Sequence, residues 1–259
     1  MAKVFAVANQ KGGVGKTTSS VNISAGLANA GKRVLLVDLD PQGNATMGSG
    51  VDKNALTVSV YDVLVDNVSI DTAAIFSEQA GYSVLPANGD LTAAEVALLN
   101  VDGRQQRLKM AIANVAEPYD YVIIDCPPSL NMLTVNALVA AQGVIITMQC
   151  EYYALEGLSA LLNTIGKIAS SVNPGLKVFG LLRTMFDARS SLSNDVAAQL
   201  HKHFGEKVFR TVIPRNVRLA EAPSYGLPAL QYDRQSKGAL AYEALAQEIL
   251  KRVNDTTGK

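Results

Sequence analysis

The amino-acid sequence predicts an α/β fold, a doubly wound and mostly parallel sheet with helices on both faces. Short apolar runs recur along the chain, and most are followed by a stretch with the apolar spacing of an amphipathic helix. Several runs, such as those at 33–39 and 119–125, are apolar on both faces, as expected for strands that helices cover on two sides. This alternation of strand and helix favours parallel pairing through right-handed crossovers.

The expected elements follow in chain order. Strands are expected at residues 3–8, 33–39, 82–86, 119–125, 144–149, 178–185 and 208–213. Helices are expected at residues 17–30, 104–115, 155–172, 196–204 and 239–253. Residues 43–100, here called the insert, are less regular and have one short helical stretch near residues 60–65. The length of 259 residues fits a single domain over 1–259, in which residues 254–259 form a polar tail.

Composition excludes several classes of protein. Hydrophobic residues make up 48% of the chain, which is too apolar for a disordered protein. No stretch reaches about 18 uninterrupted apolar residues, which excludes a membrane span, and the first residues lack the pattern of a secretory signal. Cys126 and Cys150 form neither a disulfide framework nor a zinc spacing. We therefore expect a cytoplasmic protein with reduced, buried thiols.

The most informative segment is the glycine-rich loop, KGGVGKTT at residues 11–18, which joins the first expected strand to the first helix. Gly12, Gly13 and Gly15 allow backbone angles that other residues avoid, so that amide N–H groups can surround an anion. The helix that follows directs its N-terminal dipole at the same point. Lys16 can reach the β- and γ-phosphate oxygens of a nucleotide, and the Thr17 hydroxyl suits a Mg²⁺ site.

This loop departs from the common phosphate-binding pattern G-x-x-x-x-G-K-[ST]. Gln10 occupies the first glycine position, and a second lysine, Lys11, begins the loop. The pattern K-G-G-x-G-K-T, placed between a strand and a helix, still indicates a phosphate site rather than a glycine-rich turn with chance lysines.

Two acidic strand ends complete the predicted site. The apolar run at 33–39 leads to Asp38 and Asp40, and the run at 119–125 ends in Asp125. In open α/β sheets, ligands bind at the carboxyl ends of the strands, beside the first glycine turn. A carboxylate there can hold Mg²⁺ through water or orient an attacking water. The candidate metal ligands are Thr17, Asp125 and Asp38.

Six segments resemble the ParA/Soj family of chromosome and plasmid partition ATPases: KGGVGKTT, VLLVDLDPQGNAT, YDYVIIDCPPS, QCEYYALEGL, TMFDARSSLS and IPRNVRLAEAPSYG. The resemblance extends from residue 2 to about 253. It implies a deviant Walker-A ATPase of weak intrinsic activity that uses ATP and Mg²⁺ and forms a homodimer around ATP. In that state it would bind double-stranded DNA nonspecifically, and a ParB-type centromere-binding partner would stimulate hydrolysis. Such a protein would be cytoplasmic and associated with the nucleoid, not with a membrane.

The resemblance also implies roles for matching residues. Lys11 would reach across the dimer to the partner's nucleotide, and Gly12 would lie where the two subunits meet. Asp40 would position the hydrolytic water, and Asp125 would be the Walker-B carboxylate. The implied catalytic residues are Lys11, Lys16 and Asp40. The implied nucleotide-binding residues are Lys11, Gly12, Gly13, Val14, Gly15, Lys16, Thr17, Thr18, Pro214 and Asn216, the last two beside the adenine. A lysine supplied in trans would make hydrolysis depend on dimerisation, because phosphoryl transfer needs fixed cations.

The formal net charge of zero hides an uneven distribution. Residues 1–150 hold 9 basic and 13 acidic side chains, whereas residues 151–259 hold 14 and 10. Residues 177–218, here called the basic segment, hold 8 basic and 3 acidic side chains, a net charge of +5. From residues alone this is either a solvated face or a phosphate-binding surface. The resemblance points to Arg189 and Arg218 as DNA contacts, with Arg215 and Lys202 in reserve.

Several charged residues have simpler interpretations. Arg183 stands in an expected strand and is interpreted as a strand-end charge that reaches solvent, or as part of the nucleotide or DNA surface. His201 and His203 lack the spacing of a zinc site and are expected on the surface. Glu151 is interpreted as a charge at the start of a helix.

Three alternative functions share the glycine-rich loop. A MinD-like positioning ATPase would need an amphipathic C-terminal helix for the membrane, whereas this chain ends in a polar tail. A carrier of the nitrogenase-iron-protein kind would need cysteines that bridge a cluster between subunits. A biosynthetic ATP-dependent ligase should have an additional substrate domain, for which 259 residues leave little room.

Overall fold

The computed structural model describes residues 2–115, 119–152 and 154–257 of the chain. In these residues one sheet has seven strands in the order β3-β4-β2-β5-β1-β6-β7. The strands are β1 (Lys3–Ala8), β2 (Val34–Asp38), β3 (Ile75–Ser77), β4 (Tyr82–Leu85), β5 (Tyr121–Asp125), β6 (Gly143–Gln149) and β7 (Lys177–Thr184). Every pairing is parallel except that of β3 with β4. The predicted doubly wound, mostly parallel sheet is therefore confirmed.

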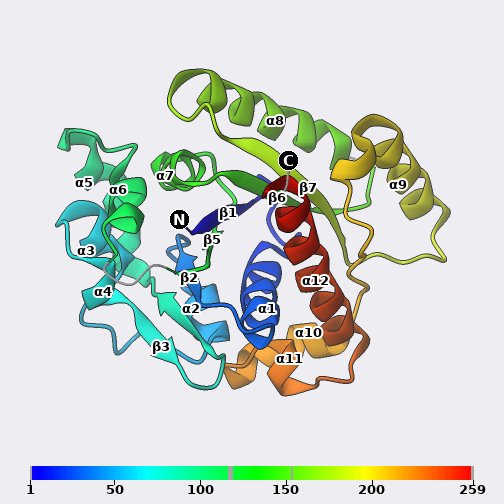
Figure 1. Cartoon of the computed structure of the whole chain (residues 1–259), viewed down its shortest axis with the longest axis horizontal. Coiled ribbons are helices and arrows are strands. Elements are labelled where there is room, and N and C mark those ends of the chain that lie inside the picture. The colour runs from blue at the N-terminus through cyan, green and yellow to red at the C-terminus, as the bar shows by residue number, and fades with distance from the viewer. Residues whose placement is uncertain (1, 116–118, 153, 258–259) are drawn as a thin grey trace.

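Helices cover both faces of this sheet (Figure 1). Alternate residues of β1 explain why, because Val4, Ala6 and Ala8 belong to one hydrophobic cluster and Phe5 and Val7 to another. The first cluster includes residues of α6 (Arg107–Ala113), α7 (Met132–Ala140), α8 (Ala154–Ser171) and α9 (Ser191–Phe204). The second includes residues of α1 (Lys16–Asn29), α11 (Ala229–Tyr232) and α12 (Lys237–Thr257). The glycine-rich loop joins β1 of the sheet to α1 of the second layer.

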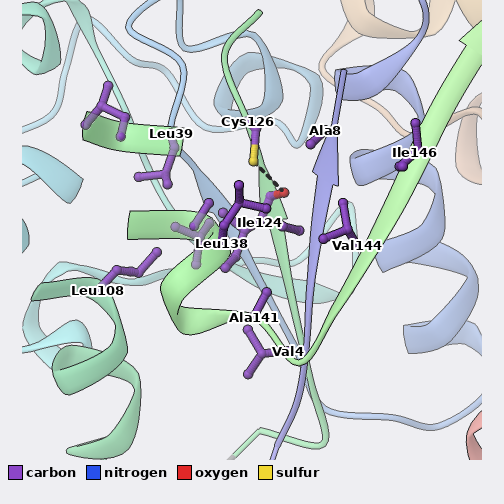
Figure 2. Packing of buried hydrophobic residues seen from close by; sticks show 14 of the residues in the cluster. Val4, Ala8, Leu39, Leu108, Ile124, Cys126, Leu138, Ala141, Val144 and Ile146 are labelled. Atoms are coloured by element: carbon purple, nitrogen blue, oxygen red, sulfur yellow. Dashed lines mark hydrogen bonds between the residues drawn. The ribbon is translucent and has the colours of Figure 1, made fainter. Parts of the chain in front are cut away.

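Both cysteines are buried free thiols, as the sequence predicts. Figure 2 shows Cys126, which follows β5, with its sulfur directed back toward the Ile124 carbonyl in the first cluster. Desolvation by burial raises the pKa of the Cys126 thiol well above its ordinary value. Such a thiol stays protonated and packs as a small apolar side chain.

The insert combines short elements at one edge of the sheet. They are α2 (Asn44–Gly48), α3 (Val60–Val65), α4 (Ile70–Ala73), the β3–β4 hairpin and α5 (Ala94–Ala97). The sequence predicts the helix near residues 60–65, whose Ser59 and Asp62 form a capping box. The short strand β3 and helix α7 are not among the predicted elements.

The strand predicted at 208–213 is wrong. The segment runs beside β7 without forming a continuous ladder. It makes one isolated bridge, Val208 with Leu181, and the N–H groups of Phe209 and Ile213 donate to carbonyls of β7. The backbone N–H groups of Arg210 and Thr211 instead donate to the Glu248 carboxylate of α12, each over 2.9 Å. Because these donors are committed to a side chain, they are not available for a continuous ladder.

The C-terminal helix extends further than predicted. α12 continues to Thr257, so residues 254–257 of the expected polar tail are helical. Of the helices in the described ranges, none is both long enough and apolar enough to cross a membrane.

Candidate nucleotide site

The glycine-rich loop has the backbone geometry of an anion cradle. Gly13 and Gly15 have φ of +72° and +81°, in the left-handed region that favours glycine, and Gly15 is the N-cap residue of helix α1. An added Cβ at Gly12 or Gly13 would meet no atom within 4 Å, so space is open above the loop. The loop is also fixed at one side, because the Thr184 hydroxyl of β7 donates to the Val14 carbonyl over 2.8 Å. This arrangement fits a phosphate group.

The two lysines of the loop lie in different environments. Lys16 is buried, and its Nζ donates to the Lys11 carbonyl over 3.1 Å, which places the ammonium inside the loop. Desolvation lowers the pKa of Lys16, while the nearby Asp125 carboxylate opposes that shift. Lys11 instead extends outward to Glu151, with Nζ and Oε2 2.5 Å apart and about half of each side chain exposed. Lys16 is thus part of the subunit's own cradle, whereas Lys11 lies at its rim.

The predicted metal residues Thr17 and Asp125 are in direct contact. The Thr17 hydroxyl donates to Asp125 Oδ2 and the Ser20 hydroxyl to Oδ1, both over 2.8 Å. Asp125 is fully buried, and desolvation, followed by the adjacent Asp38 charge, raises its pKa. A divalent cation bound beside this carboxylate would add positive charge to that of Lys16 and favour its ionised form. The Thr hydroxyl and Asp carboxylate are hard oxygen ligands that suit Mg²⁺.

Protein side chains alone do not form a metal cage here. Within the described ranges, no group of three or more His, Cys, Asp and Glu side chains could hold a metal ion. Mg²⁺ commonly takes only one or two protein ligands and completes its shell with water and substrate phosphates. The pair of Thr17 and Asp125 beside an open phosphate loop fits that mode of binding.

Asp38 and Asp40 have different environments. Asp38 ends β2 in register with Asp125 of β5, and it is fully buried. Its carboxylate accepts from the Thr46 backbone N–H and hydroxyl and from the Asp40 backbone N–H. Asp40 is partly exposed and accepts from the Gln42 N–H over 2.9 Å. Asp40 is therefore the more accessible of the two carboxylates. The oxygens of Asp38 instead accept hydrogen bonds from Asp40 and Thr46, in the loop that contains Asp40.

Pro214 and Asn216, the predicted adenine residues, are carried by the segment beside β7. Pro214 bridges to Phe186, and the Ile213 N–H donates to the Arg183 carbonyl next to Thr184. Since Thr184 contacts the glycine-rich loop, this segment passes the same end of the sheet. The Asn216 side chain caps α10 (Val217–Glu221) by accepting from the Arg218 N–H. Thr18, the last predicted nucleotide residue, follows Thr17 in the first turn of α1.

Arg189 and Arg218, the two arginines predicted to contact DNA, are exposed and paired with carboxylates. Arg189 makes a two-bond contact with Asp187, at 3.0 and 2.9 Å, which lowers the pKa of Asp187 to about 2. Arg218 contacts Glu221 at 2.7 Å and Asp233 at 3.3 Å. The reserve residues Arg215 and Lys202 are also exposed. Pro214 and Phe186 form a bridge, so the loops carrying Arg189 and Arg215 run side by side.

Arg183 is not a solvent-reaching charge, contrary to the first interpretation. Its side chain is buried and donates to the Phe209 carbonyl over 3.0 Å and to the Arg210 carbonyl over 3.4 Å. These hydrogen bonds connect the 208–213 segment to Arg183 of β7. His201 and His203 are exposed, as predicted.

Four residues at the site were not predicted. Ser20 lies one helical turn after Thr17, and that spacing could have indicated it. Glu151 was interpreted as a helix-start charge, but it pairs with Lys11 across 140 positions. Thr46 and Thr184 reach the site from distant segments, and nothing in their local sequence signals it.

The chain matches the AAA domain family over residues 2–178. It is 52% identical over 249 residues to the sporulation initiation inhibitor protein Soj of Bacillus subtilis, covering 96% of this chain and 98% of that protein. It is 48% identical over 259 residues to the chromosome partitioning protein ParA of Caulobacter vibrioides, covering 99% and 97%. Both relatives are matched over nearly their full length.

Solved structures share the fold. Cobyrinic acid a,c-diamide synthase from Mycobacterium smegmatis, with bound ADP and magnesium, is 42% identical with a TM-score of 0.86, covering 98% of this chain and 96% of that chain. The septum site-determining protein MinD from Pyrococcus horikoshii, complexed with Mg-ADP, is 26% identical with a TM-score of 0.78, covering 96% of each chain.

The parallel sheet, the glycine-rich loop and the acidic strand ends define a P-loop ATPase of the AAA-domain class. Within that class, the chain belongs to the ParA/Soj family of chromosome partitioning ATPases.

Proposed function

We propose that this protein is an ATP-driven switch for chromosome or plasmid partitioning, active as a nucleotide-dependent homodimer. The observation that carries the proposal is the contrast between the two loop lysines. Lys16 is buried within its own loop, whereas Lys11 is half exposed and directed to the rim. A cation so placed is available to the nucleotide of a second subunit facing the loop.

The residues of the glycine-rich loop are those expected to bind a nucleotide with Mg²⁺. Backbone N–H groups of residues 12–17 and the Lys16 ammonium would hold the phosphates of ATP or ADP, and Thr17 would ligate Mg²⁺, with Asp125 acting through water. Pro214 and Asn216 would lie beside the adenine. Bound Mg²⁺ would neutralise part of the negative charge on the phosphates during phosphoryl transfer.

Hydrolysis would combine one residue from each subunit. Asp40 is partly exposed next to the loop and would orient the attacking water. Lys11 of the facing subunit would stabilise the charge that develops on the phosphoryl oxygens. Hydrolysis would then be slow in an isolated subunit and would depend on dimerisation.

Dimerisation would also control attachment to DNA. Arg189 and Arg218 are exposed in the basic segment, and each subunit alone offers few phosphate contacts. A dimer doubles them, so ATP would raise nonspecific affinity for double-stranded DNA, and a ParB-type partner that stimulates hydrolysis would release it from the nucleoid.

The test is DNA binding by the full chain with ADP, ATP and a slowly hydrolysed ATP analogue. We expect tight binding with ATP and the analogue, weak binding with ADP, and a weaker ATP-dependent part in Arg218→Ala. Arg234→Ala is the matched control, since Arg234 is an exposed arginine paired with Glu243 outside the basic segment. Equal DNA binding in all nucleotide states would contradict the proposal.

A MinD-like membrane-associated ATPase is the second candidate, and the fold similarity to MinD supports it. In the described part of α12, Asn254 and Asp255 are exposed polar residues, whereas a helix that lies on a membrane presents an apolar face to it. Flotation with anionic lipid vesicles and ATP separates the two functions. The partition function predicts that the protein stays in the bottom fraction.

A further inference from the structure

The insert contacts the loop of Asp40 from one side through Lys53. Asp40 Oδ1 accepts from the Gln42 N–H over 2.9 Å, and the carbonyl of Gln42 accepts from Lys53 Nζ over 2.6 Å. One residue thus links the two contacts, since Gln42 binds the carboxylate with its N–H and the lysine with its C=O. Lys53 belongs to the insert, whereas Asp40 and Gln42 precede it.

A second connection passes through Thr46, which is completely buried. Its hydroxyl donates to Asp38 Oδ2 over 2.8 Å and accepts from the Ala87 N–H over 2.9 Å. The other oxygen of Asp38 accepts from the Asp40 N–H over 3.1 Å. The hydroxyl of Thr46 therefore joins the insert at Ala87 to the backbone of Asp40 by way of Asp38.

Gly43 shows how closely the turn after Asp40 packs against Lys53 and Ala87 of the insert. It has a φ of +60°, and an added Cβ would lie 2.6 Å from the Ala87 carbonyl and 2.9 Å from Cδ of Lys53. The turn itself is closed by the Gly43 N–H, which donates to the Asp40 carbonyl over 2.9 Å. The loop that contains Asp40 thus contacts the insert at two places, Lys53 and Ala87.

We propose that Thr46 and Lys53 are positioning residues for hydrolysis, and that one role of the insert is to hold Asp40 in place. This inference rests on the proposed role of Asp40 in orienting the attacking water. A misplacement of about 1 Å in such a group costs on the order of 100-fold in rate, so contacts that fix the loop act on the chemical step. They do not touch the phosphate cradle, so nucleotide affinity is unaffected.

The two residues differ in how strongly they act. Thr46 is buried and its hydroxyl makes both a donated and an accepted bond. Its replacement by valine removes one of the three hydrogen bonds that the Asp38 carboxylate accepts and leaves the Ala87 N–H without an acceptor. Lys53 is partly exposed and makes one bond to a carbonyl. We expect Thr46→Val to slow hydrolysis about 10-fold or more and Lys53→Met about threefold.

The experiment measures single-turnover hydrolysis of ATP with Mg²⁺, and ATP affinity separately, in the full chain. Thr46→Ser keeps the hydroxyl and should restore the wild-type rate. Lys109→Met is the control for Lys53→Met, because Lys109 is an exposed lysine on α6 away from the Asp40 loop. Affinity for ATP should stay within about twofold in all of them. Hydrogen exchange at residues 40–47 should be faster in Lys53→Met than in Lys109→Met.

Each outcome decides the inference. A wild-type rate in Lys53→Met overturns it, as does a rate in Thr46→Ser as low as in Thr46→Val, or a parallel loss of ATP affinity. If Thr46→Val does not fold, Lys53→Met and its exchange pattern decide alone. Failure of the proposed function is distinguishable, because then wild type does not hydrolyse ATP or Asp40→Ala hydrolyses it at the wild-type rate.

Discussion

The charged residues at the carboxyl end of the sheet and the two arginines of the basic segment that are predicted to contact DNA lie in opposite environments. At the sheet end, Asp38, Asp125 and Lys16 are buried, and each carboxylate accepts two or three hydrogen bonds from surrounding residues. In the basic segment, Arg189 and Arg218 are exposed and paired with carboxylates at the surface.

This difference separates fixed chemistry from reversible binding. A buried, hydrogen-bonded network keeps its geometry, because breaking it leaves uncompensated polar groups away from water. Exposed ion pairs contribute only about 0–1 kcal/mol, so an incoming phosphate can replace the carboxylate at little cost. The sheet end is suited to catalysis and the basic segment to a contact that must be released.

The largest effect is expected at the buried end. Lys16→Ala removes the ammonium inside the loop, and ATP affinity should fall about 100-fold or more, because charged hydrogen bonds to phosphate are lost in a desolvated site. Titration with a fluorescent ATP analogue measures it. Lys32→Ala, an exposed lysine after α1, is the control. An affinity within threefold of wild type would show that Lys16 does not hold phosphate.

At the rim, Lys11→Ala should abolish ATP-dependent dimerisation while leaving ATP affinity nearly unchanged. The reason is that Lys11 lies outside its own cradle and pairs with Glu151. Sedimentation with ATP and with ADP measures the dimer. A mutant that still dimerises on ATP would remove the assignment of Lys11 to the facing subunit.

The basic segment should show a strong dependence on salt. If a dimer neutralises about four phosphates, the log–log slope is roughly −3.6, and affinity for DNA falls on the order of 100-fold between 50 and 200 mM salt. Arg218→Ala should halve the slope to about −1.8, because two of the four contacts are lost. An affinity for DNA that does not change with salt would rule out phosphate neutralisation as the mechanism.

The smallest effect concerns the partner of Arg218. Glu221→Gln should raise DNA affinity about two- to threefold, since the guanidinium loses a competing carboxylate and exposed ion pairs are weak. Glu206→Gln, an exposed change of charge in the same segment, corrects for the general effect of removing an acid. A decrease relative to that control would mean that Glu221 orients Arg218 instead of competing for it.

The sequence was sufficient for those parts of the site that follow from local pattern and strand order. Glycine spacing predicts the left-handed angles at Gly13 and Gly15, and parallel alternation predicts that Asp38 and Asp125 meet at one sheet edge. These inferences need only the backbone preferences of glycine and the register of parallel strands.

The remaining features depend on contacts between distant segments. Glu151 approaches Lys11 only because β6 lies beside β1 in the sheet. The 208–213 segment has the apolar pattern of a strand, but the Glu248 carboxylate takes two of its N–H groups. Thr46 is one of many small polar residues in the insert, and only the fold brings it to both Asp38 and Ala87. Local propensity carries no information on such pairings.

The most direct test of the account mixes two inactive variants, Lys11→Ala and Asp40→Ala, and measures ATP hydrolysis. If Lys11 serves the nucleotide of the facing subunit, the mixed dimer contains one site with both groups, namely Asp40 from the Lys11→Ala subunit and Lys11 from the other. The account therefore predicts that mixing restores hydrolysis well above the sum of the two variants. Hydrolysis that remains at that sum although sedimentation shows the mixed dimer would contradict it, because a lysine acting within its own subunit leaves every site of the mixed dimer incomplete.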